Sequence, residues 1–243
     1  MTAVVIGASS GLGRALASEL AQQQQSLLLV ASDARDLQAL ASDLRLRHGV
    51  AVHTLALDLA SEPDPGARVL GALQDLPAAS ALLLPIGYSR EDDDFSLSAG
   101  ALGQLLAINL HAPMVITQAL LPQLVQQRGV VIGFGSVAAV RGRRRNVVYA
   151  ACKRGLQTFF ESLRQRWTAP ELRVQFYALG FMRSNLTHGM LLPLPRAEPA
   201  RIARHVVRNL RRGSFQHHLP HWWAAIGLAL RCLPWPLFRR LKS

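Results

Sequence analysis

Hydrophobic residues occur along the chain in short runs separated by longer amphipathic stretches. The short runs are rich in Val, Leu and Ile, which is typical of parallel strands buried on both faces. Strands are expected at Ala3–Gly7, Ser26–Ala31, Val50–Leu57, Ala81–Pro85, Val130–Gly133 and Arg173–Ala178. Helices are expected at Leu12–Gln24, Arg35–His48, Leu97–Asn109, Pro113–Gln126 and Val148–Trp167. This alternation predicts an α/β fold in three layers, with a doubly wound parallel sheet of the Rossmann type.

The composition suits one globular domain. Of the 243 residues, 50% are hydrophobic and 17% are charged, which excludes a disordered or fibrous chain. Two cysteines cannot form a disulfide framework. No export signal and no run of about 18 apolar residues stands out, so a cytoplasmic location is expected.

The charge is strongly basic, with 27 Lys and Arg against 15 Asp and Glu. Such a surplus favours an anionic partner, which leaves nucleic acid, a membrane surface or a phosphorylated substrate. No nucleic-acid recognition motif accompanies it, so nucleic acid is not expected.

A glycine-rich loop, Gly7-Ala8-Ser9-Ser10-Gly11-Leu12-Gly13, lies between the first expected strand and helix. Glycines allow a tight turn and a close approach of the backbone to a ligand, and the helix N-terminus attracts a diphosphate. The loop therefore predicts a dinucleotide site with contacts at Gly7, Ser9, Ser10, Gly11, Leu12 and Gly13. The alternative is a tight strand–helix turn that binds nothing.

The choice between NAD and NADP stays open. After the second strand, Ser32 is neutral, Asp33 could bond the ribose hydroxyls of NAD, and Arg35 could reach the phosphate of NADP. Asp58, followed by Leu59, could accept a hydrogen bond from the adenine, or it could cap the following helix.

A serine, a tyrosine and a lysine form the candidate catalytic group. Tyr149 and Lys153 are four residues apart and share a helix face, and Ser136 ends the preceding strand. An ammonium beside the phenol is expected to lower the tyrosine pKa, and the serine could hold a carbonyl oxygen. Alone, the Tyr-x3-Lys spacing would more often mark a solvated helix face; the serine and glycine loop favour catalysis. Cys152 is expected to be a packing residue.

These motifs together resemble the short-chain dehydrogenase/reductase family over about residues 1–215. The resemblance implies an NAD(P)-dependent oxidoreductase whose catalytic tetrad is Asn109, Ser136, Tyr149 and Lys153. It makes Tyr149 the acid–base group and gives Asn109 a water in the proton relay, although Asn109 could equally be a helix cap. It also implies a homo-oligomer and cofactor contacts at Gly87, Tyr149, Lys153, Gly180, Met182 and Ser184.

Two segments depart from the family pattern. The Asn-Asn-Ala-Gly motif is replaced by Leu84-Pro85-Ile86-Gly87, and the Pro-Gly after the sixth strand is replaced by Leu179-Gly180. Both changes concern cofactor contacts rather than the tetrad.

An arginine-rich loop, residues 141–145, lies between Ser136 and Tyr149. Guanidinium groups match phosphate oxygens, so Arg141, Arg143, Arg144 and Arg145 are candidate substrate ligands at the mouth of the site. The alternative is a solvated basic loop. The acidic run Glu91–Asp94 could pair with these arginines or be solvated, and no chemistry is assigned to it.

The C-terminal extension, residues 216–243, is apolar and basic and is not expected to be an independent domain. Trp222, Trp223 and Trp235 occur with flanking arginines, which is typical of a segment lying in a membrane surface. The alternative is a helix docked on the core or on a partner. His217, His218 and His221 lack accompanying ligands, so no metal is expected.

Within the family, the stretch Val140–Lys153 and the basic C-terminal end resemble the decaprenylphosphoryl-2-keto-pentose reductases. That resemblance implies carbonyl reduction on a lipid-linked sugar at the membrane, after an FAD-dependent oxidase. Two alternatives are a soluble carbonyl reductase or alcohol dehydrogenase of a small substrate, and a dinucleotide-binding scaffold.

Overall fold

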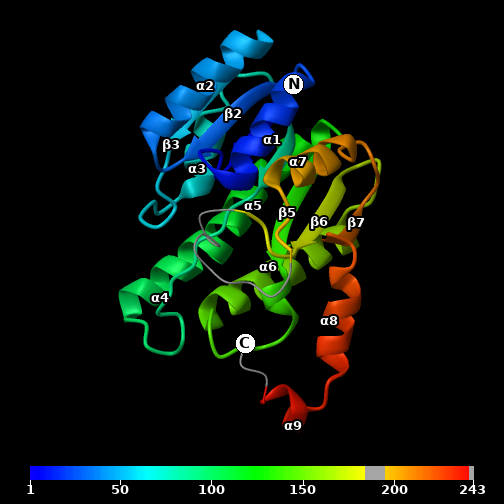
Figure 1. Ribbon diagram of the computed structural model, residues 1–243. Coiled ribbons are helices and arrows are strands. Elements are labelled where there is room, and N and C mark those ends of the chain that lie inside the picture. Colours follow the sequence, from blue (N-terminus) through cyan, green and yellow to red (C-terminus); the bar gives the residue numbers. More distant parts are fainter. Residues whose placement is uncertain (184–194, 241–243) are drawn as a thin grey trace.

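A seven-stranded parallel sheet forms the centre of the molecule (Figure 1). The computed structural model describes residues 1–183 and 195–240. The strand order is β3-β2-β1-β4-β5-β6-β7, which confirms the predicted doubly wound sheet. The strands are β1 (Thr2–Ile6), β2 (Ser26–Ala31), β3 (Val52–Ala56), β4 (Ala79–Leu84), β5 (Val130–Ser136), β6 (Arg173–Leu179) and β7 (Phe215–Leu219).

Helices cover both faces of this sheet (Figure 1). The longer ones are α1 (Gly11–Gln22), α2 (Ala34–His48), α4 (Ala99–Leu106), α5 (Ala112–Gln126), α6 (Val147–Arg166), α7 (Pro199–Arg208) and α8 (Trp223–Cys232). The shorter ones are α3 (Pro65–Gly71), the π-turn η1 (Ala107–His111), the 3-10 turn η2 (Val137–Val140) and α9 (Trp235–Phe238).

Two apolar cores hold the three layers together. On one face, Leu16 of α1 and Val206 of α7 pack against β-strand residues such as Val5. On the other face, Ile116 of α5 and Phe160 of α6 pack against the same sheet. Strand residues alternate between the two cores, which explains why the strands read as continuous apolar runs.

The sequence did not predict β7, α3 or α7. Strand β7 reads Phe-Gln-His-His-Leu and lies at the edge of the sheet, beside β6 only. An edge strand exposes part of its side chains, so polar residues are tolerated there and the apolar signal is lost. The pairing of β7 with β6 is regular, with Leu179 opposite Leu219.

Helices α4, η1 and α5 form one continuous helical stretch from Ala99 to Gln126. By length and composition alone this stretch is apolar enough to cross a membrane. Its residues Ile116, Leu120 and Leu124 are fully buried in the core beneath the sheet. The packing therefore identifies it as a core helix of the α/β fold.

The C-terminal segment, residues 220–240, folds against the carboxyl edge of the sheet. Trp223 and Phe238 are buried, and α8 contacts β7 and η2. In Figure 1, α8 and α9 extend beyond that edge of the sheet. The segment therefore forms one wall beside the end of β5, where Ser136 lies.

Candidate active site

The glycine loop brings α1 into direct contact with β1. Gly7 has a φ of +90°, a conformation that favours glycine, and its N–H donates to the Val30 carbonyl at 2.7 Å. A Cβ on Gly13 would lie 1.9 Å from the Gly7 carbonyl oxygen, so only glycine fits there. The altered segment at Pro85 passes alongside Gly7, so the departure from the family pattern borders the nucleotide loop.

The N-terminus of α1 is open to an anion. Its N-cap, Ser10, makes no side-chain capping bond, whereas α2 is capped by Asp33, α3 by Asp64 and α4 by Ser98. The Arg14 guanidinium adds positive charge beside the loop and donates to the Ser9 carbonyl at 2.7 and 3.0 Å. Free N–H groups, a positive dipole and a loop that admits only glycine fit the diphosphate of a dinucleotide.

The residues expected to bind the ribose of the nucleotide either form other contacts or are exposed. The Asp33 carboxylate accepts the N–H of Asp36 at 2.9 Å and caps α2, which leaves it less free for ribose hydroxyls. Ser32 and Arg35 are exposed. Asp58 accepts hydrogen bonds from Ala60 and Ser61, so it caps the turn after β3.

Lys153 is buried between the strands that carry the site. Its ammonium donates to the Ile86 carbonyl at 2.6 Å and to the Phe134 carbonyl at 3.3 Å. Burial lowers the pKa of Lys153 to about 8. The ammonium lies 5.8 Å from the centre of the Tyr149 ring, so the predicted pairing of these two side chains on one face of α6 is observed.

The expected fall in the tyrosine pKa is wrong for this structure. Burial raises the pKa of the Tyr149 phenol, and only a hydrogen bond with the Ser136 side chain opposes that rise. Desolvation disfavours the phenolate, and the Lys153 ammonium is held by two carbonyls. Tyr149 is therefore a protonated phenol at neutral pH. Burial also raises the pKa of the Cys152 thiol to about 11, in keeping with a packing role.

Ser136 has its hydroxyl proton free for a ligand or for Tyr149. Its oxygen accepts the N–H of Ala138 at 3.1 Å, which fixes the oxygen at the end of β5. A hydroxyl oxygen that already accepts a hydrogen bond can still donate its own O–H to a carbonyl. Ser136 thus takes the position expected from the sequence.

Asn109 is fully buried in the π-turn η1. Its amide donates to the carbonyls of Tyr88 and Leu105 at 2.8 and 3.0 Å, and its oxygen accepts the Tyr88 N–H at 3.0 Å. The side chain therefore clamps the connection after β4 rather than capping a helix end. π-Turns inside α-helices frequently mark functional positions.

The remaining expected cofactor contacts lie near the carboxyl edge. Gly180 follows β6, and Met182 forms a bridge with Ala197. Gly87 follows Ile86, whose carbonyl binds Lys153. Ser184 lies outside the described residues.

Two of the four loop arginines hold the C-terminal segment. Arg141 donates to the Leu233 and Leu230 carbonyls and lies over the Phe238 ring at 4.1 Å. Arg144 donates to the Arg239 carbonyl at 3.0 Å. Burial lowers the pKa of Arg143, and Arg145 is exposed.

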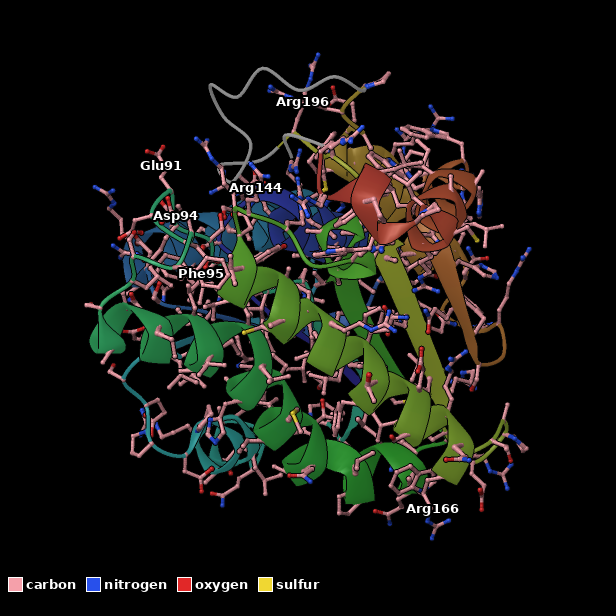
Figure 2. All side chains as sticks on the ribbon, turned by 90° about the horizontal axis from the view of Figure 1, so that it is seen from below. Glu91, Asp94, Phe95, Arg144, Arg166 and Arg196 are labelled. Atoms are coloured by element: carbon pink, nitrogen blue, oxygen red, sulfur yellow. The ribbon has the colours of Figure 1, made fainter. Side chains whose placement is uncertain are left out.

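A groove of about 740 Å³ opens between this loop, α6 and α9. Its apolar lining includes Ala139, Ala150, Ala151, Trp235 and Phe238, and its basic lining consists of Arg141, Arg143, Arg144, Arg154 and Arg239. Phe95, which is 84% exposed, and Arg144 border it, and Figure 2 shows both near the start of α6, far from Arg166 at its end.

Sequence reasoning missed two residues at the site. Trp223 covers Gly180, and its buried indole nitrogen has no hydrogen-bond partner among the described residues. Asp93, within the acidic run to which no chemistry was assigned, is fully buried against the start of α6. No local pattern singles out either residue, since each acts across a long stretch of sequence.

Known proteins place this arrangement in one family. A family model described as short chain dehydrogenase matches residues 1–191. An uncharacterized oxidoreductase of Myxococcus xanthus is 29% identical over 99% of this chain and 97% of its own length. A 3-oxoacyl-[acyl-carrier-protein] reductase of Bos taurus is 30% identical over 75% of this chain and 76% of its own. A solved short-chain dehydrogenase from Sphingobium yanoikuyae, in complex with NADPH, is 25% identical, with a TM-score of 0.84 over 100% of this chain and 96% of its own.

A parallel sheet, an open glycine-loop helix and a Ser–Tyr–Lys group define an NAD(P)-dependent oxidoreductase. The chain belongs to the short-chain dehydrogenase family. When bound, the nicotinamide supplies the hydride. In this arrangement the Ser136 hydroxyl can hold a carbonyl oxygen, the Tyr149 phenol can give that oxygen a proton, and the Lys153 ammonium places positive charge near the phenol ring.

Proposed function

We propose that this enzyme reduces a ketone on a phosphorylated lipid, such as a polyprenyl-phosphate keto-sugar, at a membrane surface. The observation that carries the proposal is the groove beside the arginine loop. An apolar floor suits a hydrocarbon chain, and arginines at its rim suit phosphate oxygens. Neither feature is needed for a small neutral ketone.

The position of the groove suits the part of a substrate remote from its carbonyl. Val147, Ala150 and Arg154 line the groove, whereas Tyr149 and Lys153 lie on a different face of α6, since successive residues are about 100° apart. Arg141, Arg143 and Arg144 of the arginine loop also line the groove. A carbonyl at Tyr149 with a phosphate at the loop would leave a long chain free to enter the groove.

The tyrosine can supply the proton that reduction of a carbonyl consumes. Burial raises the pKa of Tyr149, which keeps the phenol protonated in the free enzyme. The same group would take the proton back in the reverse reaction. The oxoacyl reductase of Bos taurus, by its name, also acts on an oxo group borne by a carrier.

The outer face of the C-terminal segment supports the membrane part of the proposal. Leu228 and Trp235 are 64% and 63% exposed, and Trp222 and Leu237 are also exposed. Arg231, Arg239 and Arg240 flank them, and exposed tryptophans beside cations are typical of interfacial segments.

The decisive assay follows cofactor oxidation with NADH and NADPH against a polyprenyl-phosphate keto-pentose, generated in situ by an FAD-dependent oxidase. Turnover that disappears in Tyr149→Phe supports the proposal. Turnover of small ketones alone, with none of the lipid, contradicts it and favours a soluble carbonyl reductase.

The groove is tested separately with Ala151→Trp, which fills its floor, and Arg143→Ala, which removes a cation. Both should raise KM for the lipid at least tenfold while a small ketone is unaffected. Arg166→Ala, at the far end of α6, is the matched control and should change neither value.

Membrane contact is tested by sedimentation with vesicles of anionic or zwitterionic lipid. The double variant Trp235→Ser and Leu237→Ser changes exposed residues and should lose binding to anionic vesicles. Deleting the segment is a poorer test, because Trp223 and Phe238 are buried. Equal sedimentation of both proteins would contradict this part of the proposal.

A further inference from the structure

One short connection joins the two helical elements that carry Asn109 and Tyr149. Residues 88–93 follow β4, and at one end Tyr88 is held by its main-chain N–H and carbonyl to the Asn109 side chain, at 3.0 and 2.8 Å. At the other end Asp93 is held to the first turn of α6. Asn109 and Tyr149 are thus linked through six residues of main chain.

Asp93 makes three hydrogen bonds to consecutive residues of α6. Its carboxylate oxygens accept the N–H of Val148 and the N–H of Tyr149, each at 2.9 Å. Its main-chain carbonyl accepts the N–H of Val147 at 3.2 Å. One of these donors belongs to the catalytic tyrosine itself.

The residue that directly precedes α6 does not perform this task. The residue at the N-cap position of α6, Asn146, has a left-handed conformation and makes no side-chain capping bond. The open amides of the first turn are therefore satisfied from a segment 55 residues away along the chain. A carboxylate is well suited, because charge-assisted bonds and the helix dipole both favour an anion there.

The neighbouring acids are engaged elsewhere. Asp92 forms a bidentate pair with Arg90 at 2.8 Å, and Asp94 accepts the Ser96 hydroxyl at 2.7 Å. Glu91 and Asp94 are exposed, and Figure 2 shows both at the periphery of the molecule. Asp93 is the member of the run that is fully buried.

We propose that Asp93 is a positioning residue for the reaction, which sets the place of Tyr149 through the main-chain N–H of that residue. The inference rests on the catalytic role of Tyr149 and is independent of which ketone is reduced. A displacement of about 1 Å in a reacting group can lower a rate about a hundredfold. Loss of these bonds should therefore lower kcat without altering the nucleotide site at α1.

The first experiment needs no substrate. Amide hydrogen exchange is compared between wild type, Asp93→Asn and the matched control Asp94→Asn. In Asp93→Asn the peptide that contains residues 147–153 should exchange at least tenfold faster, while residues 157–166 of the same helix stay protected. Unchanged exchange at residues 147–153 would overturn the proposal.

The second experiment links this turn to catalysis. With NADPH and 9,10-phenanthrenequinone as the probe ketone, Asp93→Asn should lower kcat about a hundredfold and leave the KM for NADPH within twofold. Asp93→Glu, which keeps both carboxylate oxygens as acceptors, should recover part of the loss and covers the case in which Asp93→Asn does not fold. A normal kcat in a variant with fast exchange at residues 147–153 would also overturn the proposal.

The two readouts separate this inference from the proposed function. A wild-type enzyme that ignores the keto-lipid contradicts the lipid proposal alone. The exchange result and the comparison with the probe ketone decide the role of Asp93.

Discussion

The indole of Trp223 lies directly on Gly180, so closely that a Cβ at position 180 would come within 1.8 Å of the indole nitrogen. This contact joins the C-terminal segment to the end of β6, next to the register partner of Ser136. The last helices of the chain therefore pack at the edge of the sheet that carries the candidate catalytic group.

Gly180→Ala is expected to displace α8 and to destabilise the protein by about 3 kcal/mol, since the added methyl meets a buried aromatic ring. Thermal melting measures the loss. Gly71→Ala, where a Cβ meets nothing within 4 Å, is the control. Equal melting temperatures would mean that the indole moves aside without penalty.

Gly13→Ala should abolish nucleotide binding. Its Cβ would lie 1.9 Å from a backbone oxygen of Gly7, so α1 must move away from β1 and from the bound diphosphate. Quenching of tryptophan fluorescence by NADPH measures binding, with Gly142→Ala as a control in open space. Retained binding in a folded Gly13→Ala protein would contradict the assigned site.

Arg35 is expected to favour NADPH over NADH. Because the Asp33 carboxylate caps α2, the Arg35 guanidinium is the group that is better able to bind the phosphate on the ribose of NADP. Arg35→Glu should lower kcat/KM for NADPH about tenfold, or about 1.4 kcal/mol, and leave NADH nearly unchanged. An equal loss with both nucleotides would exclude a phosphate contact.

The buried ammonium of Lys153 should make stability depend on pH. Its folded pKa of about 8 lies below the usual 10.5, so between these values the unfolded chain binds more protons and stability rises with pH. Wild type should gain up to about 3 kcal/mol relative to Lys153→Met across this window. Denaturant titrations at pH 7, 8, 9 and 10 measure the difference, and a constant difference would contradict a lowered pKa.

Arg141 should hold the C-terminal segment in place. Arg141→Ala removes bonds to the Leu230 and Leu233 carbonyls and the contact with Phe238, which should cost about 2 kcal/mol and expose α8 and α9 to proteolysis. Mass spectrometry of the first cleavage products is the measurement. The protease should cleave Arg145→Ala as it cleaves wild type, and identical cleavage of both variants would rule out the role given to Arg141.

Much of the fold follows from the sequence because buried parallel strands leave an unmistakable apolar pattern. The runs around Val5, Leu29 and Ile132 all became central strands. Strand β7 could not be predicted, since an edge position tolerates Gln216, His217 and His218.

The pairing of Tyr149 with Lys153 was predictable for a different reason. Tyr149 and Lys153 are related by helical spacing, which is a local property. Asp93 and Trp223 act on residues 56 and 43 positions away, at Tyr149 and Gly180, and spacing carries no information about such pairs. The tyrosine pKa was predicted in the wrong direction because burial, which dominates it, is a property of the folded chain.

The π-turn at residues 107–111 has a consequence for how this chain tolerates change in length. A π-turn accommodates one more residue than a regular helix at the same place. Because the π-turn takes up the extra residue locally, deleting Ala107 is expected to restore regular winding and to leave the faces of α4 and α5 in register. Asn109 would change its place on the turn and lose its hydrogen bonds to Tyr88, so a deletion here is expected to keep the packing of the helix while releasing the connection after β4.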